Sequence, residues 1–280
     1  MRKLFFILLF VFTTSAANAQ SGGMALSPAR FELEMEPGSE TTVVLNLDHR
    51  GDPGASQAAR IVATLNDWNM TRDGRVEYFP ANTRPDSASP WLIYTPGEAA
   101  VMPGTVHQIR VTVSVPSNAT PGDHLTALVI EQRPETLKPQ PGLRQMVVRY
   151  RMASVFYIKV KNLNRKGDLG DLLAEAAPDG VVVTPTLRNE GNTMIRPTSS
   201  VKVVDKDGKI VADMPDIEML PVLAGAEMLQ PVHLDAQLAA GNYTVKYRVD
   251  FQDGRSPTEG VTDLVVRTQT ASSEKTNKKP

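Results

Sequence analysis

The sequence predicts an all-β protein that consists of two immunoglobulin-like β-sandwich domains. Short runs of alternating or uniformly apolar residues recur between turn signals, as is typical of sandwiches. Proline and glycine are frequent, with 21 and 19 residues, and helical periodicity is scarce. The longest run, residues 146–160, contains no Gly, Pro, Asn or Asp and is rich in residues that favour strands.

We place the first domain at residues 20–160 and the second at residues 161–268, because the polar stretch 161–168 separates two sets of strands. The chain has no cysteine, so each domain must be held together by its own apolar core, and 41% hydrophobic residues suffice for that. The strands that we expect span residues 41–47, 60–65, 106–115, 124–132, 181–187, 200–204, 232–234, 243–251 and 261–267.

Three Asp-Gly dipeptides, at residues 73–74, 207–208 and 253–254, predict hairpin turns, because Gly and Asp tolerate positive φ angles. Tyr243 follows another turn signal, and we expect it to pack at a corner of the second sandwich. Residues 168–177 are a short helical candidate, with an irregular connection as the alternative.

Residues 1–19 have the pattern of a cleaved secretory signal: two basic residues, an apolar stretch of about nine residues and a small-residue cleavage site. That stretch is far shorter than the ~20 residues that span a bilayer, and no later segment is long and apolar enough. We therefore expect an exported chain with no transmembrane segment after signal removal. Residues 269–280 are polar and basic and predict a disordered tail.

The sequence offers little catalytic chemistry. Its four histidines are scattered singly, without the spacing of a metal site, and no phosphate-binding loop, dinucleotide fingerprint or nucleophile elbow is present. We expect no enzyme activity, no cofactor and no metal. The net charge of −1 gives no reason to expect a nucleic-acid partner. Trp68 and Trp91 are expected to be core anchors.

The run at residues 146–160 has one apolar face. Its even positions are all apolar except Ser154, whereas Arg149, Arg151 and Lys159 lie at odd positions. Such a face must be buried against other apolar groups, in the same domain or on a partner. We expect the first half, up to Tyr150, to be available to a partner, and residues 155–160 to pack in the core of their own domain.

Several short motifs follow one another along the first 160 residues. Residues 26–31 read Leu-Ser-Pro-Ala-Arg-Phe, residues 90–96 read Pro-Trp-Leu-Ile-Tyr-Thr-Pro, and residues 102–104 form a Met-Pro-Gly turn. Val-Phe-Tyr follows at residues 155–157. In order and spacing these motifs resemble the N-terminal domain of PapD-like periplasmic pilus chaperones.

The resemblance implies a periplasmic, non-enzymatic chaperone that binds pilus or fimbrial subunits by donor-strand complementation. In that family a long seventh strand is lent to a pilin-like subunit that lacks its own last strand. An arginine and a lysine hold the C-terminal carboxylate of the subunit, and an outer-membrane usher is a further possible partner.

Residue by residue, the family arginine matches Arg30, and the donor residues match Met146, Val148 and Tyr150. Ser154 stands where the family has its lysine, so the second cation has no counterpart at that position. Arg30 as a solvated strand arginine is the alternative to a carboxylate clamp. Ordinary burial is the alternative for the three donor residues.

A second class of function fits the same sequence: an exported tandem immunoglobulin-like module that binds a surface protein or a glycan. The two classes differ in what covers the 146–160 strand. A chaperone would expose part of that strand until a subunit binds, whereas a structural module would cover it internally.

Overall fold

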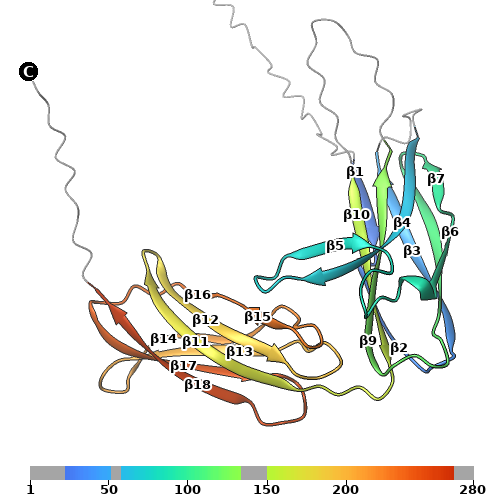
Figure 1. Cartoon of the computed structure of the whole chain (residues 1–280). Helices are drawn as coiled ribbons and strands as arrows, with labels where there is room; N and C mark the ends of the chain where they lie inside the picture. The colour runs from blue at the N-terminus through green and yellow to red at the C-terminus, as the bar shows by residue number, and fades with distance from the viewer. Residues whose placement is uncertain (1–22, 52–57, 134–149, 268–280) are drawn as a thin grey trace, which may run out of the picture.

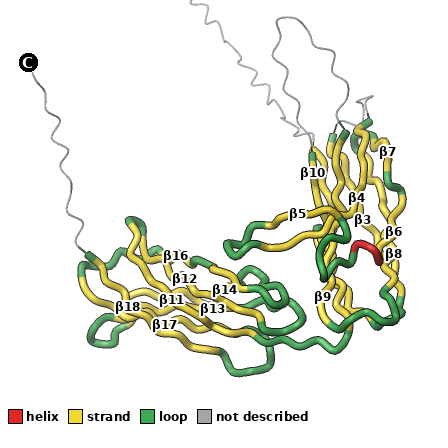
Figure 2. The backbone as a smooth tube through the Cα atoms, viewed as in Figure 1, coloured by secondary structure: helices red, strands yellow, loops and turns green. Residues whose placement is uncertain are grey.

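The computed structural model describes residues 23–51, 58–133 and 150–267, so the expected signal peptide and tail lie outside the described residues. These residues fold into two β-sandwiches set at an angle to each other (Figure 1). Helix is limited, within this part of the chain, to a single 3-10 turn at Ser89–Trp91 (Figure 2). The predicted fold class, all-β with two immunoglobulin-like sandwiches, is confirmed.

The first sandwich, at residues 23–160, packs two sheets face to face. One sheet has the spatial order β1 (Gly23–Ser27), β3 (Glu40–Arg50), β8 (Thr105–Ser114) and β6 (Leu92–Thr95). The other has the order β2 (Arg30–Met35), β10 (Arg151–Val160), β9 (Gly122–Gln132), β4 (Ala59–Met70) and β5 (Val76–Pro80), and β7 (Glu98–Val101) also pairs with β4. The chain crosses from the first sheet to the second between β1 and β2.

The core of the first sandwich confirms the expected role of residues 155–160. Phe156, Ile158 and Val160 are fully buried there, among Leu45 of β3 and Ile109 of β8. These even positions of β10 face the opposite sheet, as strand alternation requires. The second half of the long run therefore ties β10 into its own domain.

The second sandwich follows a short connection at residues 161–166. One sheet contains β11 (Gly167–Ala177), β12 (Gly180–Asn189), β15 (Glu227–Leu229) and β16 (Val232–Leu234). The other has the order β14 (Ile210–Glu218), β13 (Thr198–Val204), β17 (Gly241–Asp250) and β18 (Thr258–Val266). Its separate core is centred on Val183, Val203 and Tyr247.

The helical candidate at residues 168–177 was wrong, because this segment is strand β11. Its pairing with β12 shifts register between Leu169 and Leu172. Such a β-bulge brings two residues three apart onto the same face, and both leucines pack on the core of the second sandwich. A spacing of three within a bulged strand thus imitates one face of a helix.

The three predicted hairpin turns are confirmed. Gly74, Gly208 and Gly254 have φ angles of 78° to 83°, and each lies between two consecutive paired strands. Tyr243 also behaves as expected: its side chain packs on the second core, and its hydroxyl donates to the carbonyl of Ala239 at 2.9 Å. This is the corner contact typical of such sandwiches.

Candidate functional site: a strand edge beside an interdomain cleft

Strand β10 has a half-open edge. Along its whole length, from Arg151 to Val160, it pairs with β9 without a break in register. On its other side the parallel strand β2 begins only opposite Val155, which pairs with Arg30. Within the described residues, the backbone of residues 151–154 therefore has no strand on that side.

The backbone groups that face this open edge can be assigned from the pairing. The N–H of Val155 donates to the carbonyl of Ala29, on the β2 side, at 3.0 Å. Backbone groups alternate in direction along a strand, so the N–H of Ala153 points to the same side. An open edge of this kind is a template for pairing with another chain.

The predicted donor residues lie just before this edge. Met146 and Val148 are outside the described residues. Tyr150 is half-buried, and its carbonyl accepts a hydrogen bond from the N–H of Gln132 at 2.9 Å. The roles of these three residues in binding a subunit stay predictions.

Ser154 is fully buried rather than displayed in the cleft. Its hydroxyl donates to the carbonyl of Pro28 at 2.9 Å and so joins β10 to the crossover between β1 and β2. Because its hydrogen atom is already used inside the protein, Ser154 is a poor substitute for a cation. The role assigned to it by the resemblance stays a prediction.

Arg30 begins β2 at the point where the open edge ends. Its side chain is 50% exposed, and its Nε lies 3.0 Å from Oε1 of Glu32. The remaining guanidinium N–H groups face the space between the two sandwiches, which Arg30 lines. The role of Arg30 in binding a carboxylate stays a prediction, and its ion pair with Glu32 was not predicted.

Glu32 is the centre of a group of charges that sequence reasoning missed. Besides Arg30, it accepts Lys159 Nζ at 2.8 Å on Oε2 and Arg196 Nη2 at 2.8 Å on Oε1. Burial raises the pKa of Glu32, but hydrogen bonds from Lys159 and Arg196 outweigh it, so the pKa is lowered overall. We call these four residues the Glu32 cluster.

Lys159 lies at an odd position of β10, on the same face as Tyr157. Its side chain is 7% exposed with its ammonium on Glu32, so it is buried in the cluster and is not displayed in the space that Arg30 lines. Arg196 instead enters the cluster from the second sandwich, 164 residues away from Glu32 in the chain. No local sequence pattern could have revealed that contact.

Asp123, at the start of β9, fastens the second sandwich to the first. Its carboxylate accepts the Thr193 hydroxyl at 2.7 Å and the Met194 N–H at 2.6 Å, and its own N–H donates to the Asn192 carbonyl at 2.8 Å. Burial raises the pKa of Asp123, and the two hydrogen bonds to its carboxylate only partly oppose this. Together with the Glu32 cluster, this region has three cations and two carboxylates.

An apolar contact accompanies these polar bonds. Trp68, expected to be a core anchor, is buried where the sandwiches meet and donates its indole N–H to the Thr126 carbonyl at 3.0 Å. Its ring meets that of Tyr157 edge to face, with centroids 5.2 Å apart. Met194 and Leu223 of the second sandwich complete this cluster.

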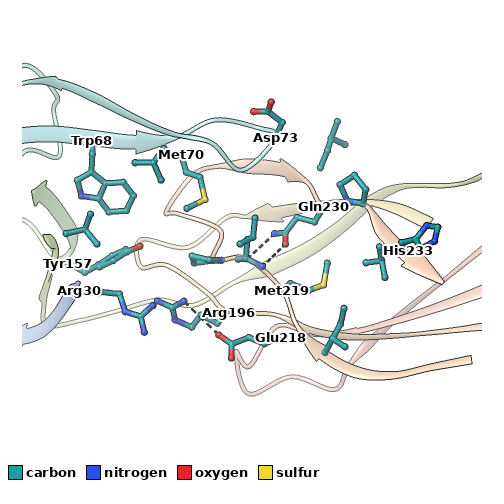
Figure 3. A pocket seen from close by; sticks show the side chains of 18 of the residues that line it. Arg30, Trp68, Met70, Asp73, Tyr157, Arg196, Glu218, Met219, Gln230 and His233 are labelled. Atoms are coloured by element: carbon teal, nitrogen blue, oxygen red, sulfur yellow. Dashed lines mark hydrogen bonds and ion pairs between the residues drawn. The ribbon is translucent and has the colours of Figure 1, made fainter. Parts of the chain in front are cut away.

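A cleft of about 730 Å³ opens between the sandwiches next to this contact. We call it the interdomain cleft (Figure 3). Arg30, Trp68 and Tyr157 line its wall on the first sandwich, and Arg196 and Met219 line its wall on the second. The cleft thus has two guanidinium groups at one end and largely apolar walls.

The hairpin of β4 and β5 reaches the second sandwich beyond the cleft (Figure 1). The carbonyl of Arg72 accepts the Leu229 N–H at 2.8 Å, and Arg72 Nη2 lies 2.6 Å from Oε1 of Glu227. The two sandwiches are therefore joined at two separate places, at Asp123 and at the hairpin tip.

Other candidate chemistry is sparse in the described residues. They contain no group of three His, Cys, Asp or Glu side chains placed to hold a metal ion. They also contain no helix with the length and apolar character that a bilayer crossing requires. Trp91 packs partly buried on the first core and contacts the ring of His124.

No family model and no curated protein matches the chain in sequence. Solved structures do match it. One is a chaperone–tip adhesin complex of CFA/I fimbriae biogenesis, with 10% identity over 87% of this chain and 99% of that chain and a TM-score of 0.46. Another is the CsuC–CsuE chaperone–tip adhesion subunit complex of Acinetobacter baumannii, with 16% identity over 87% and 98% and a TM-score of 0.41.

A third match is the E. coli chaperone DraB, with 12% identity over 88% of this chain and 98% of that chain and a TM-score of 0.42. In each case nearly the whole of the solved chain is covered. At these identities the likeness concerns the fold alone.

Proposed function

We propose that this protein is a periplasmic chaperone that binds an unfinished fimbrial or pilus subunit by adding the edge of β10 to the sheet of the subunit. The observation that carries the proposal is the late start of β2, opposite Val155, which leaves residues 151–154 open on one side. The open edge directly follows the apolar alternation at Met146, Val148 and Tyr150.

Strand addition gives affinity through the backbone and specificity through side chains. In our proposal the N–H and C=O groups of Arg151 and Ala153 pair with the subunit. Met146, Val148 and Tyr150 then fill the groove that the subunit has for its missing strand. No covalent chemistry and no nucleotide are needed, since the energy comes from hydrogen bonds and from burial of apolar surface.

Arg30 is proposed to fix the register of this pairing by binding the C-terminal carboxylate of the subunit. A one-residue slip would turn every donor side chain to the wrong face, so a fixed end point is valuable. A guanidinium suits this role because it binds a carboxylate with two parallel hydrogen bonds.

The proposal is tested by purifying the tagged full chain from periplasm in which the neighbouring fibre genes are expressed. We expect a pilin-like partner to co-purify, identifiable by mass spectrometry. Arg30→Ala should reduce the recovered partner by about tenfold, the effect of losing a charge-assisted hydrogen bond of roughly 1.5 kcal/mol or more.

Arg50→Ala is the matched control, because Arg50 also pairs with a carboxylate two residues away, Asp48, but lies on β3. That variant should capture the partner normally. Recovery of no partner by the wild-type chain would contradict the proposed function. Equal recovery by Arg30→Ala would remove Arg30 from the site and leave the strand pairing in place.

The alternative function, an exported module that binds a surface protein or glycan, predicts a different behaviour of β10. Amide hydrogen exchange separates the two. In a chaperone the Ala153 amide should exchange quickly in the free protein and become protected in the complex. In a structural module whose strand is covered internally, the same amide should be protected at all times.

A further inference from the structure

Two arginines from different sandwiches meet on one oxygen atom. Arg30 Nε lies 3.0 Å from Oε1 of Glu32, and Arg196 Nη2 lies 2.8 Å from the same atom. Arg30 belongs to β2, whereas Arg196 precedes β13 in the second sandwich. Glu32 therefore holds the two guanidinium groups next to each other, at one end of the interdomain cleft that both line (Figure 3).

Most N–H groups of the two arginines are not bound to Glu32. Each guanidinium has five N–H donors, and Glu32 takes one from each arginine. The nearest other carboxylate to Arg196 is that of Glu218, which is 4.0 Å from Nη1 and itself mostly exposed. The pair can thus accept a further anion without losing Glu32.

Tyr157 adds a third donor at the same place. Only 3% of this residue is exposed, yet its hydroxyl has no hydrogen-bond partner among the described residues. Figure 3 shows the hydroxyl directed into the cleft beside Arg30. The hydroxyl oxygen itself is not fully buried, so it is accessible from the cleft and can donate a hydrogen bond to a ligand oxygen there.

We propose that Arg196 supplies the second cation of the carboxylate site, together with Arg30 and the Tyr157 hydroxyl, and that the ligand is the C-terminal carboxylate of an extended peptide. The identification of this peptide with the end of a subunit rests on the proposed function. Arg196 thereby supplies, from the opposite sandwich, the positive charge that Ser154 lacks.

The walls of the cleft favour a peptide over a free anion. Trp68, Met70, Val155 and Met219 surround the arginine pair with apolar surface, which suits the side chains that precede a terminal carboxylate. A ligand of this kind would contact both sandwiches at once.

The site can be tested without knowing the subunit. The probe is an N-acetylated tetrapeptide of alternating Val and Ala with a free C-terminal carboxylate, titrated into the full chain while the arginine Nε–H signals are followed by NMR. The same peptide with a C-terminal amide is the comparison. We expect the carboxylate peptide to shift the Arg30 and Arg196 signals and the amide peptide to leave them unchanged.

The variants then assign the donors. Arg196→Ala should lower the affinity for the carboxylate peptide by about tenfold, as expected for the loss of a charge-assisted hydrogen bond. Tyr157→Phe should lower it by about threefold to fivefold. Arg248→Ala is the matched control, since Arg248 lies on the same sandwich with an ion pair to Asp216 at 3.6 Å but does not line the cleft. It should bind like wild type.

Arg196→Lys keeps a cation beside Glu32, so its affinity for the carboxylate peptide should lie between those of wild type and Arg196→Ala. If Arg196→Ala does not fold, the proposal is tested by Arg196→Lys and Tyr157→Phe instead. Wild-type affinity for the carboxylate peptide in both variants would overturn it. Equal binding of the amide peptide, or no binding of the carboxylate peptide by wild type, would overturn it as well. Subunit capture is a separate measurement, so a normal capture by Arg196→Ala would leave the proposed function standing without this residue.

Discussion

Asp253 shows how a single carboxylate holds one end of the second sandwich together. Its side chain is 3% exposed, and it accepts hydrogen bonds from the N–H of Gly167 and the N–H of Arg255, both at 3.1 Å. The Arg255 side chain pairs with the same carboxylate, and chiefly for this reason the pKa of Asp253 is lowered from 3.8 to about 2. Asp123 has the opposite shift, because burial outweighs its hydrogen bonds.

The shift of Asp253 predicts a pH-dependent loss of stability. The folded pKa lies below the unfolded value of 3.8, so this group contributes stability above pH 3.8 and loses it as the pH falls toward 2. We expect Asp253→Asn to lower the free energy of unfolding at pH 7 by about 1–2 kcal/mol. Denaturant unfolding of the full chain at pH 7 and pH 3 measures this.

The difference between Asp253→Asn and wild type should shrink between pH 4 and pH 2. Asp207→Asn is the control, because Asp207 lies in the turn between β13 and β14 and is exposed. It should leave stability unchanged at each pH. A difference for Asp253→Asn that stays constant down to pH 2 would contradict the ionised carboxylate as the cause.

Strands β10 and β11 show what could be read from the sequence and what could not. Period-two alternation predicted that Phe156, Ile158 and Val160 face the core, because geometry along a strand is local. The opposite face of β10 was harder to read. Tyr157 and Lys159 are also buried, since the second sandwich and Glu32 cover that side. In β11, the bulge between Leu169 and Leu172 imitated helical spacing.

The edge of β10 makes a prediction of its own. Ala153→Pro removes the N–H that points to the open side, while the pairing with β9 keeps its register. The variant should stay folded, because that N–H has no partner strand among the described residues, yet it should lose subunit capture. Circular dichroism checks the fold, and co-purification from periplasm measures the capture.

Ala153→Ser is the control for this experiment, because it keeps the N–H and is nearly the same size. It should capture the subunit like wild type. Normal capture by a folded Ala153→Pro variant would contradict backbone pairing at this position and would favour a different face of the first sandwich.

The contacts between the two sandwiches set the limit of what the sequence could predict at the scale of the whole molecule. Arg30 was proposed as a site residue from its motif, since the motif is local. The contacts of Arg196, Asp123 and Tyr157 were not predicted, because they depend on how the two sandwiches dock. Thr193 and Asp123 are 70 residues apart, and neither stands in a pattern that marks it as a partner of the other.

The hairpin tip gives a prediction for the whole molecule. Arg72→Ala removes the ion pair to Glu227 and should loosen the backbone bond from the Leu229 N–H to the Arg72 carbonyl. We expect the Leu229 amide to exchange about two- to fivefold faster, in keeping with the small contribution of an exposed ion pair. Hydrogen exchange followed by NMR measures this.

Arg75→Ala is the matched control, because Arg75 pairs with Asp73 inside the same hairpin at 2.8 Å. In the Arg75→Ala variant the Leu229 amide should exchange at the same rate as in wild type. Equal acceleration in both variants would mean that the hairpin as a whole, and not its contact with the second sandwich, had been disturbed.

The hairpin of β4 and β5 has a mechanical consequence. The two sandwiches meet at Asp123, and the hairpin joins them again farther out, so the three parts form a triangle (Figure 1). A second contact restricts the movement of one sandwich against the other more than a single contact would. We therefore expect the width of the interdomain cleft to change little when a chain binds, so that ligands are selected by size.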